Sequence, residues 1–273
     1  MIDAIRRLFA PKVDAKPVFE ISEKEMQAVI PINRQSLSHV SNWIDEYAFK
    51  NSCFKYGVPD FIKDDINKPI NNDLTYTDLM LHLINKHFAQ LNYLEIGVSV
   101  GKNFYQLLQG VKSGKFTGFD IEEINPVLEK QLKLVDRSEW QTPAKSIKKT
   151  ASSYKTYIAD GKTVNYLCAD VWDENSWAKL KGQKFNLVFS DALHTPQAIL
   201  FEFEMLVKYD LLADKFIIFW DDLVGKMKYS FYKIIRKYDK EYQIKDIYLL
   251  SINGWIGEHE GPHSVGVISN FNL

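Results

Sequence analysis

The spacing of apolar residues changes character about a third of the way along the chain. Up to about residue 90, apolar side chains recur every three or four residues, which predicts helices over 36–49 and 75–88. A loop rich in Asp, Asn and Pro separates these two helices. From residue 93 onward, short β-type runs alternate with helical segments, and this alternation is typical of βαβ units with a parallel sheet. We therefore expect a helical N-terminal extension or cap over 1–90 and an α/β domain over 91–273.

Seven β-type runs stand out in the second part of the chain. The last two are joined by about a dozen residues without a helical run, so they should form an antiparallel hairpin whose final strand is reversed. A Lys-rich segment over 145–162 interrupts the second crossover and is interpreted as an insertion. The expected strands are 93–98, 116–121, 164–169, 185–190, 216–220, 247–252 and 264–269.

Two apolar stripes at helical spacing predict helices that cover the sheet. The first stripe lies between the fourth and fifth expected strands, and the second lies between the fifth and sixth. They consist of Ile199, Leu200, Phe203, Leu206, Val207 and Leu211, and of Met227, Phe231, Ile234, Ile235, Tyr238 and Tyr242.

Composition excludes several classes of protein. Of the 273 residues, 46% are hydrophobic and 25% are charged, which is enough apolar material for a substantial core. The 34 basic and 35 acidic residues give a net charge of −1, so no overall signature of nucleic-acid or membrane-surface binding is present. No stretch approaches the ~20 apolar residues of a membrane span, and the first residues do not resemble a secretory signal. Cys53 and Cys168 cannot build a disulfide scaffold, and we expect a soluble cytoplasmic protein.

The strongest chemical signal is a glycine turn directly after the first expected strand. Glu95, Gly97 and Gly101 form the pattern Glu-x-Gly-x-x-x-Gly, and a helix follows. Glycines at such a turn let the backbone approach a ligand, and the helix N-terminus offers free N–H donors. The spacing differs from the Gly-x-Gly-x-x-Gly of dinucleotide-binding proteins, which argues against NAD.

Two carboxylates stand where the next two strands end, at the edge where open α/β sheets bind ligands. Asp120 ends the second strand, nineteen residues after Gly101, and can accept hydrogen bonds from both hydroxyls of a ribose. Asp170 ends the third strand, where it can hold an adenine amino group. Each Asp taken singly is also common in an ordinary turn or cap. As an ordered set with the glycine turn, they indicate a nucleoside site.

From Tyr93 to its end, the chain resembles a class I S-adenosylmethionine-dependent methyltransferase (EC 2.1.1). The resemblance covers roughly two thirds of the chain and implies a Rossmann-like, mostly parallel seven-stranded sheet with a reversed last strand. It also implies S-adenosylmethionine as the cofactor. Glu95, Gly97 and Gly101 would line its methionine end, Asp120 would bind its ribose, and Asp170 would lie near its adenine. The first ninety residues match no family that we can name.

Three further carboxylates follow the fourth and fifth strands. Asp191 comes first, and Asp221 and Asp222 follow 30 and 31 residues later. The ends of neighbouring strands should bring them together, and three like charges repel one another unless a cation or protons neutralise them. Mg²⁺ or another divalent cation suits such oxygen ligands. The alternatives are that Asp221 and Asp222 cap a helix, and that Asp191 accepts from local amides.

The same residues resemble metal-dependent O-methyltransferases of the catechol type and macrocin-type sugar enzymes. A hydroxyl bound to a cation loses its proton more easily, and its oxygen is held in line with the sulfonium methyl. The resemblance places His194 where the catechol-type family has a lysine base, so His194 and Asp191 are the candidate catalytic residues. Two departures are that His replaces Lys and that Leu193 stands where macrocin-type enzymes often carry a second Asp. The alternative for His194 is a helix cap.

The tip between the last two strands, residues 253–263, should project on the same side as the other loops. Trp255, Glu258, His259 and His263 could therefore contact substrate, and the alternative is a solvated hairpin with one aromatic plug. A zinc site is weakly indicated, because no Cys or regularly spaced partner accompanies the histidines.

These observations predict methyl transfer from S-adenosylmethionine to a hydroxyl of a small-molecule acceptor, such as a sugar or a natural-product intermediate. Two alternatives remain open: a metal-independent enzyme with His194 as its base, and a catalytically silent donor-binding partner protein. Nucleic acid is a disfavoured acceptor, because Ser190-Asp191-Ala192-Leu193 stands where amino-methylating nucleic-acid enzymes carry Asn/Asp-Pro-Pro-aromatic. The basic segments 145–162 and 226–245 do not outweigh this absence. The sequence leaves the acceptor and homo-oligomerisation open.

Overall fold

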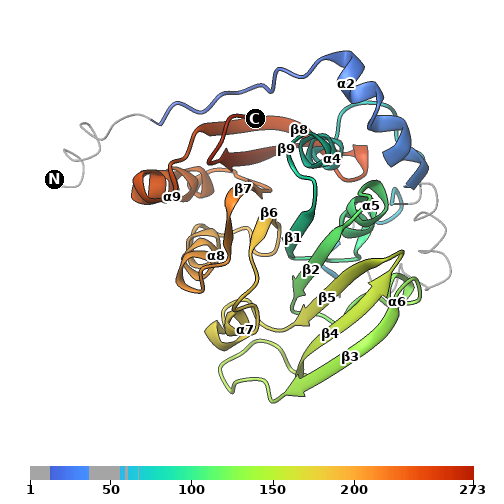
Figure 1. The fold of residues 1–273 in the computed structure, drawn as a ribbon, viewed down its shortest axis with the longest axis vertical. Helices are drawn as coiled ribbons and strands as arrows, with labels where there is room; N and C mark the ends of the chain where they lie inside the picture. The colour runs from blue at the N-terminus through green and yellow to red at the C-terminus, as the bar shows by residue number, and fades with distance from the viewer. Residues whose placement is uncertain (1–12, 37–55, 59–60, 67) are drawn as a thin grey trace, which may run out of the picture.

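The computed structural model describes residues 13–36, 56–58, 61–66 and 68–273, and these residues form a nine-stranded sheet with helices on both faces (Figure 1). The strand order is β3-β4-β5-β2-β1-β6-β7-β9-β8. The strands are β1 (Leu91–Ile96), β2 (Gly114–Asp120), β3 (Lys133–Trp140), β4 (Ser152–Ala159), β5 (Lys162–Cys168), β6 (Phe185–Ser190), β7 (Leu212–Trp220), β8 (Asp246–Gly254) and β9 (Gly257–Ser269). The helices are α2 (Glu23–Gln27), α4 (Tyr76–His87), α5 (Lys102–Gly110), α6 (Pro126–Glu129), α7 (Glu174–Ala178), α8 (Pro196–Lys208) and α9 (Lys226–Tyr242).

All seven strands expected from the sequence are present. β5, β2, β1, β6 and β7 run parallel to one another, which brings their carboxyl ends to one edge of the sheet. β9 is antiparallel to both β7 and β8, so the last strand is reversed as predicted. The crossover helices between the parallel strands therefore leave the edge of strand ends open for a ligand.

The expected count of seven strands is wrong, because β3 and β4 add an antiparallel hairpin beside β5. β4 lies inside the Lys-rich segment that was interpreted as a simple insertion. Its Lys155 is buried and pairs with Glu123 at 2.9 Å and with Glu129 at 3.2 Å. β3 is exposed on both faces except at Trp140. Neither strand therefore shows the apolar alternation by which strands are recognised in a sequence.

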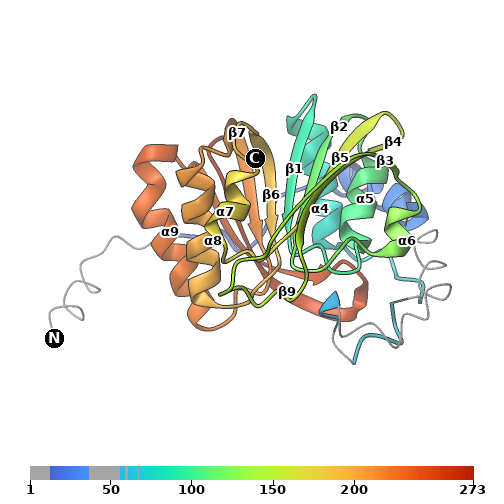
Figure 2. The ribbon, with the colours of Figure 1, turned by 90° about the horizontal axis from the view of Figure 1, so that it is seen from below.

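The sheet separates two apolar cores (Figure 2). α4, α5 and α6 cover one face, and α7, α8 and α9 cover the other. The two apolar stripes predicted from the sequence lie on α8 and α9, and most of their residues belong to the second core. Cys168 is buried and free, as a small structural thiol would be.

Helix α4 confirms the element expected over 75–88 and packs into the core with the sheet. Thr75 caps its first turn by accepting from the Asp78 N–H, while the Asp78 carboxylate accepts from the Thr75 N–H at 2.9 Å. Arg34 also binds this carboxylate at 2.9 Å, which ties the segment before residue 37 to α4. The helix expected over 36–49 lies almost wholly outside the described residues, and the division at residue 90 stays a prediction.

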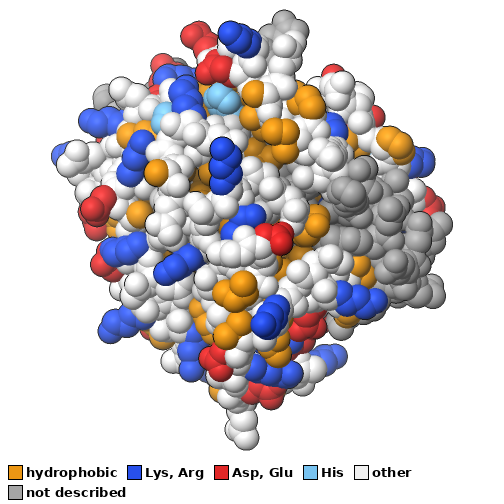
Figure 3. Space-filling view, turned by 45° about the vertical axis from the view of Figure 1, so that its right-hand side comes forward, with side chains coloured by type: hydrophobic (Ala, Val, Ile, Leu, Met, Phe, Trp, Pro, Cys, Tyr) orange, Lys and Arg blue, Asp and Glu red, His pale blue; other side chains and the backbone are white. Residues whose placement is uncertain are grey.

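On the face drawn in Figure 3, Lys and Arg side chains are scattered among acidic and apolar ones. This mixture agrees with the near-zero net charge. Among the helices described, none has the length and apolar character that a membrane crossing requires.

Candidate functional site

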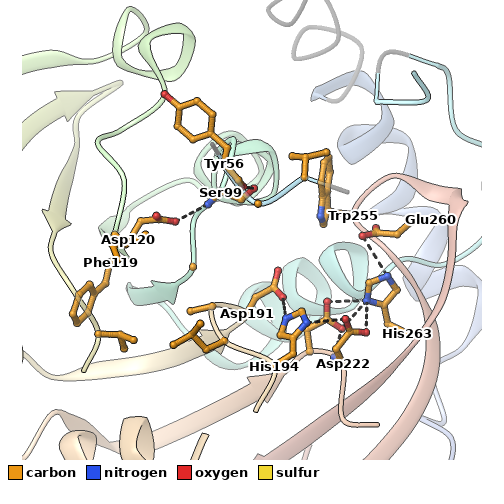
Figure 4. Close-up of a pocket in the computed structure, with 18 of the residues that line it drawn as sticks. Tyr56, Ser99, Phe119, Asp120, Asp191, His194, Asp222, Trp255, Glu260 and His263 are labelled. Carbon is orange, nitrogen blue, oxygen red and sulfur yellow. Dashed lines mark hydrogen bonds and ion pairs between the residues drawn. The ribbon is translucent and has the colours of Figure 1, made fainter. Parts of the chain in front are cut away.

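A cavity of about 530 Å³ opens where the parallel strands end (Figure 4). Its walls come from the loops after β1, β2, β5, β6 and β7, from residues 56–58 and Ile62, and from the hairpin between β8 and β9. Its volume lies within the range of small-molecule and cofactor sites, about 300–1,000 Å³. The cavity is therefore the candidate functional site among the described residues.

Gly97 lines the cavity at the turn after β1, where no larger residue fits. Its φ is +87°, and a Cβ atom would lie 2.5 Å from the Ala192 Cα and the Asp191 carbonyl oxygen. Its N–H donates to the Phe119 carbonyl at 2.8 Å. The glycine thus allows the turn after β1 to lie directly against the loop after β6.

Asp120 lines the cavity beside this turn and fixes its shape. One carboxylate oxygen accepts from the N–H groups of Val98 and Ser99 at 2.7 and 2.8 Å, and the other accepts from Glu122 N–H at 2.9 Å. Burial raises the pKa of Asp120, and these three backbone donors oppose the rise. Each carboxylate oxygen can accept more than one hydrogen bond, so the group can still bind a ligand hydroxyl. Gly97 and Asp120 together are called the donor end of the cavity below.

Glu95 and Gly101 lie behind the turn rather than among the residues that line the cavity. Glu95 is buried and accepts from the Tyr93 hydroxyl at 2.6 Å and from the Asn103 amide at 3.1 Å. Burial raises the pKa of Glu95 well above its ordinary value, and these two bonds oppose the rise. Gly101 is the N-cap of α5 with φ +82°, and a Cβ there would lie 2.5 Å from the Leu128 side chain. Both residues therefore shape the turn from below.

Asp170 also lies outside the lining of the cavity. One of its oxygens accepts from the Ser146 hydroxyl at 2.8 Å and the Ile147 N–H at 3.1 Å, and the other accepts from the Trp172 N–H at 3.0 Å. Its carboxylate thus holds the loop before β4 against the end of β5. Ala169 and Val171, its two neighbours, line the cavity instead.

At the opposite side of the cavity the structure brings together Asp191, Asp221 and Asp222, as the sequence predicted. The pairing of Ser190 with Trp220 in β6 and β7 places the residues after both strands side by side. His194 joins them, with its Nε2 3.0 Å from Asp191 and its Nδ1 3.0 Å from Asp222 (Figure 4). The expected convergence of strand-end carboxylates is therefore present.

Two residues from the β8–β9 hairpin complete this cluster. His263 Nδ1 lies 2.8 Å from Asp221 and 3.3 Å from Asp222, and its Nε2 lies 3.3 Å from Glu260. Asp191, Asp221, Asp222 and Glu260 are together called the acidic end below. The sequence named His263 as a substrate contact but did not place it among these carboxylates. Its position depends on the register of β9 beside β7, which no local motif encodes.

The carboxylates of the acidic end shift the pKa values of the two neighbouring histidines and of Asp191. Burial disfavours a charged His194, yet the hydrogen bonds that His194 donates to Asp191 and Asp222 outweigh burial and raise its pKa to about 10. Burial likewise opposes the charge on His263, and Asp221 and Glu260 raise its pKa to about 11. Burial, followed by the neighbouring Asp221, raises the pKa of Asp191 to about 7. Both imidazoles are thus positive partners of the carboxylates.

The helix-cap alternatives for these residues do not describe the structure. Thr195 is the N-cap of α8, and its side chain accepts from the Ala198 N–H. Gly225 is the N-cap of α9, three residues after Asp222. His194, Asp221 and Asp222 therefore do not cap either helix.

The tip of the β8–β9 hairpin divides into two parts. Trp255 lines the cavity together with Glu260 and His263. Glu258 accepts from the Asn71 N–H at 3.0 Å, and His259 lies 2.9 Å from the Pro69 carbonyl oxygen. These last two expected substrate contacts instead attach the hairpin to the segment before α4.

One metal-binding geometry lies within the acidic end. Asp221, Asp222 and His263 each offer a ligand atom, and these atoms lie within 4.8 Å of one another. The sequence predicted Asp191, Asp221 and Asp222 as the metal ligands, and in this group His263 takes the place of Asp191. A buried oxygen of Glu260 nearby, Oε2, has no hydrogen-bond partner. The donors and this unpaired acceptor fit a divalent cation with its bound water.

Comparisons with known proteins were made for the whole chain. Residues 94–223 match a family model described as a methyltransferase domain, and no curated protein matches. The O-methyltransferase TomG from Streptomyces achromogenes is 11% identical (98% of this chain, 94% of that chain, TM-score 0.46). The Podospora anserina methyltransferase PaMTH1 is 13% identical (92% and 97%, TM-score 0.45). These two structures are too distant to inform on substrate. Through this match, residues 94–223 are identified as a methyltransferase domain.

Proposed function

We propose that the chain transfers the methyl group of S-adenosylmethionine to a hydroxyl of a small molecule, with help from a divalent cation. The observation that carries this proposal is one cavity with a glycine turn and Asp120 at one end and the strand-end carboxylates at the other. A methyl donor and a hydroxyl acceptor must meet within a few ångströms and exclude water between them. A single cavity of this composition provides both requirements.

At the donor end, Gly97 and Asp120 would contact the cofactor directly. Asp120 is already held by the turn N–H groups, so it can accept from ribose hydroxyls without losing its orientation. Ile121 and Val171 line the cavity near the ends of β2 and β5 and offer apolar surface to the adenine ring. Glu95, Gly101 and Asp170 would act through the loops that they hold rather than by contact.

At the acidic end, Asp221, Asp222 and His263 would hold the cation, with Asp191 beside them. A bound divalent cation would lower the pKa of an acceptor hydroxyl and would neutralise crowded carboxylates. Tyr56, Ile62 and Trp255 also line the cavity and would help to shield the acceptor from water.

The proton of the acceptor hydroxyl would pass to the carboxylate of Asp191, which is paired with the already protonated His194. Their side chains are 3.0 Å apart and both line the cavity, so either atom can reach an acceptor placed there. His194 also contacts Asp222, which fixes the plane of its ring from both nitrogens. This pair is the group that the sequence nominated for catalysis.

A metal-independent reaction is the second candidate, and one observation favours it. Each carboxylate of the acidic end has an imidazole partner, either His194 or His263. Two imidazolium ions would balance part of the negative charge without a cation. His194 would then act as base only after giving its proton to solvent.

The two candidates are separated by measuring methyl transfer after chelation. The protein would be treated with EDTA and supplied with radiolabelled S-adenosylmethionine and a panel of catechols, sugars and glycosides. Cation-assisted O-methylation predicts transfer to hydroxyls that stops after EDTA and returns with Mg²⁺ or Mn²⁺. Transfer that persists in EDTA would favour the second candidate. Transfer to nitrogen or carbon acceptors alone would contradict O-methylation.

A further inference from the structure

His263 gives the acidic end a nitrogen donor beside two carboxylates. The ligand atoms of Asp221, Asp222 and His263 lie within 4.8 Å of one another. Two ligands on opposite sides of a cation, each at about 2.1 Å, are about 4.2 Å apart. Small rotations of these side chains would therefore bring all three to one ion.

Glu260 holds the imidazole of His263 from the opposite side. The Nε2 of His263 lies 3.3 Å from a Glu260 oxygen, while its Nδ1 faces the two Asp side chains. Both side chains are close to nine-tenths buried, with 12% and 11% of their surface exposed. Histidines that bind metals characteristically donate their second N–H to a carboxylate, which fixes the ring and raises its basicity. Glu260 and His263 have this arrangement.

Tyr76 provides an independent sign that a ligand belongs here. The side chain is completely buried, and its hydroxyl has no hydrogen-bond partner among the described residues. The centroid of its ring lies 6.0 Å from that of the His263 imidazole, in an edge-on arrangement. A buried polar group without a partner destabilises the folded protein, because it gives up its hydrogen bonds to water. A metal-bound water would accept from this hydroxyl, as it would donate to the unpaired oxygen of Glu260.

We propose that Asp221, Asp222 and His263 bind a first-row transition-metal dication, such as Mn²⁺, Co²⁺ or Fe²⁺, in preference to Mg²⁺. Carboxylate and water ligands suit Mg²⁺ and Mn²⁺ alike, whereas an imidazole ligand adds affinity for first-row transition-metal dications in the order Mn²⁺ < Fe²⁺ < Co²⁺. Glu260 is the positioning residue for His263. This inference rests on the proposed cation-assisted function and narrows the class of cation that the site takes.

The ligand set can be read directly from the full-length protein loaded with Mn²⁺. Pulsed electron paramagnetic resonance detects ¹⁴N coupled to the bound ion, and labelling the histidines with ¹⁵N changes that coupling. We expect nitrogen coupling in the unmodified protein and its loss in His263→Asp, which keeps a carboxylate ligand. His259→Ala is the matched control, because His259 lies in the same hairpin but contacts Pro69 instead.

The relative affinities for Mn²⁺ and Mg²⁺ give a second readout, because a purely structural role of His263 would not change the order of the two ions. Direct titration should show Mn²⁺ binding more tightly than Mg²⁺, and His263→Asp should reverse that order. Glu260→Ala should weaken Mn²⁺ binding by about 10–100-fold. Circular dichroism and S-adenosylmethionine binding would confirm that each variant is folded.

The outcomes separate this inference from the function on which it rests. Mn²⁺ bound without nitrogen coupling, or Mg²⁺ bound more tightly by the unmodified protein, would overturn the inference and leave cation-assisted transfer intact. If neither ion binds and methyl transfer continues in EDTA, both this inference and the proposed role of a cation in the reaction are overturned. Loss of nitrogen coupling in His263→Asp but not in His259→Ala supports the inference.

Discussion

Gly97→Ala adds one methyl group at the point where the turn after β1 meets the loop after β6. The new Cβ would lie 2.5 Å from the Ala192 Cα and the Asp191 carbonyl oxygen, both of them backbone atoms. Backbone atoms cannot rotate away as the end of a side chain can. One of the two loops must therefore move, and both of them line the cavity.

The loss of stability expected for Gly97→Ala has two contributions, one from the backbone conformation and one from the contact of the new methyl group. A non-glycine residue at φ +87° costs roughly 1–2 kcal/mol because Cβ approaches its own carbonyl oxygen. Forcing the methyl group against packed backbone adds about 1–3 kcal/mol. The sum is a loss of about 2–5 kcal/mol in the free energy of unfolding. We expect a fall of at least about tenfold in affinity for S-adenosylmethionine as the loops separate, which corresponds to about 1.4 kcal/mol.

Gly182→Ala is the matched control, because it introduces the cost of the positive φ without the contact between the new methyl group and the backbone. Gly182 has φ +86°, and a Cβ there meets no atom within 4 Å. Urea unfolding of both variants gives the difference that the backbone contact contributes, and isothermal titration calorimetry gives donor affinity. Equal losses of stability in the two variants, with donor binding unchanged in Gly97→Ala, would refute the reasoning.

Three further changes test separate parts of the structure. Asp120→Asn should weaken S-adenosylmethionine binding about 10–100-fold in calorimetry, because a bond to a charged acceptor contributes about 1.5–3 kcal/mol; unchanged affinity would exclude a ribose contact. Burial raises the pKa of Glu202 to about 8, so the folded state holds a proton that the unfolded state releases above about pH 4.5. The free energy of unfolding should therefore decrease as the pH rises from 4.5 to 8. In urea titrations, Glu202→Gln should reduce this decrease by an amount on the order of 3–5 kcal/mol. Burial lowers the pKa of Lys102 to about 7, so the unfolded state binds more protons between pH 7 and 10.5 and stability should rise with pH there. Lys102→Met should remove that rise. If a variant keeps the pH dependence of the unmodified protein, Glu202 or Lys102, respectively, is not the group responsible for it.

The parallel strands could be predicted because each is a short apolar run between turn residues, and burial on both faces requires such a run. β3 could not be predicted, because seven of its eight residues are exposed and carry no apolar alternation. The lysines of the segment interpreted as an insertion include Lys148 and Lys155, which are buried. Their carbonyl and carboxylate partners are distant in sequence, so local composition cannot reveal them.

Convergence of the strand-end carboxylates could be predicted because neighbouring parallel strands end at one edge of the sheet. The direction in which each side chain points could not be predicted. Asp170 stands at the expected strand end, yet its oxygens bind Ser146 and Ile147 of the loop before β4. His263 reaches the acidic end only through the register of β9 beside β7. Pairing registers of distant strands are set by packing rather than by a local motif.

A crystal structure of the protein with S-adenosylhomocysteine tests the central claim of a donor site facing an acidic end most directly. The account predicts the ribose hydroxyls within 3.2 Å of the Asp120 carboxylate, a normal hydrogen-bond distance. It also predicts the sulfur atom facing the side of the cavity where Asp191 and Asp222 lie. A nucleoside bound away from Asp120, or a sulfur atom pointing away from these carboxylates, would contradict it.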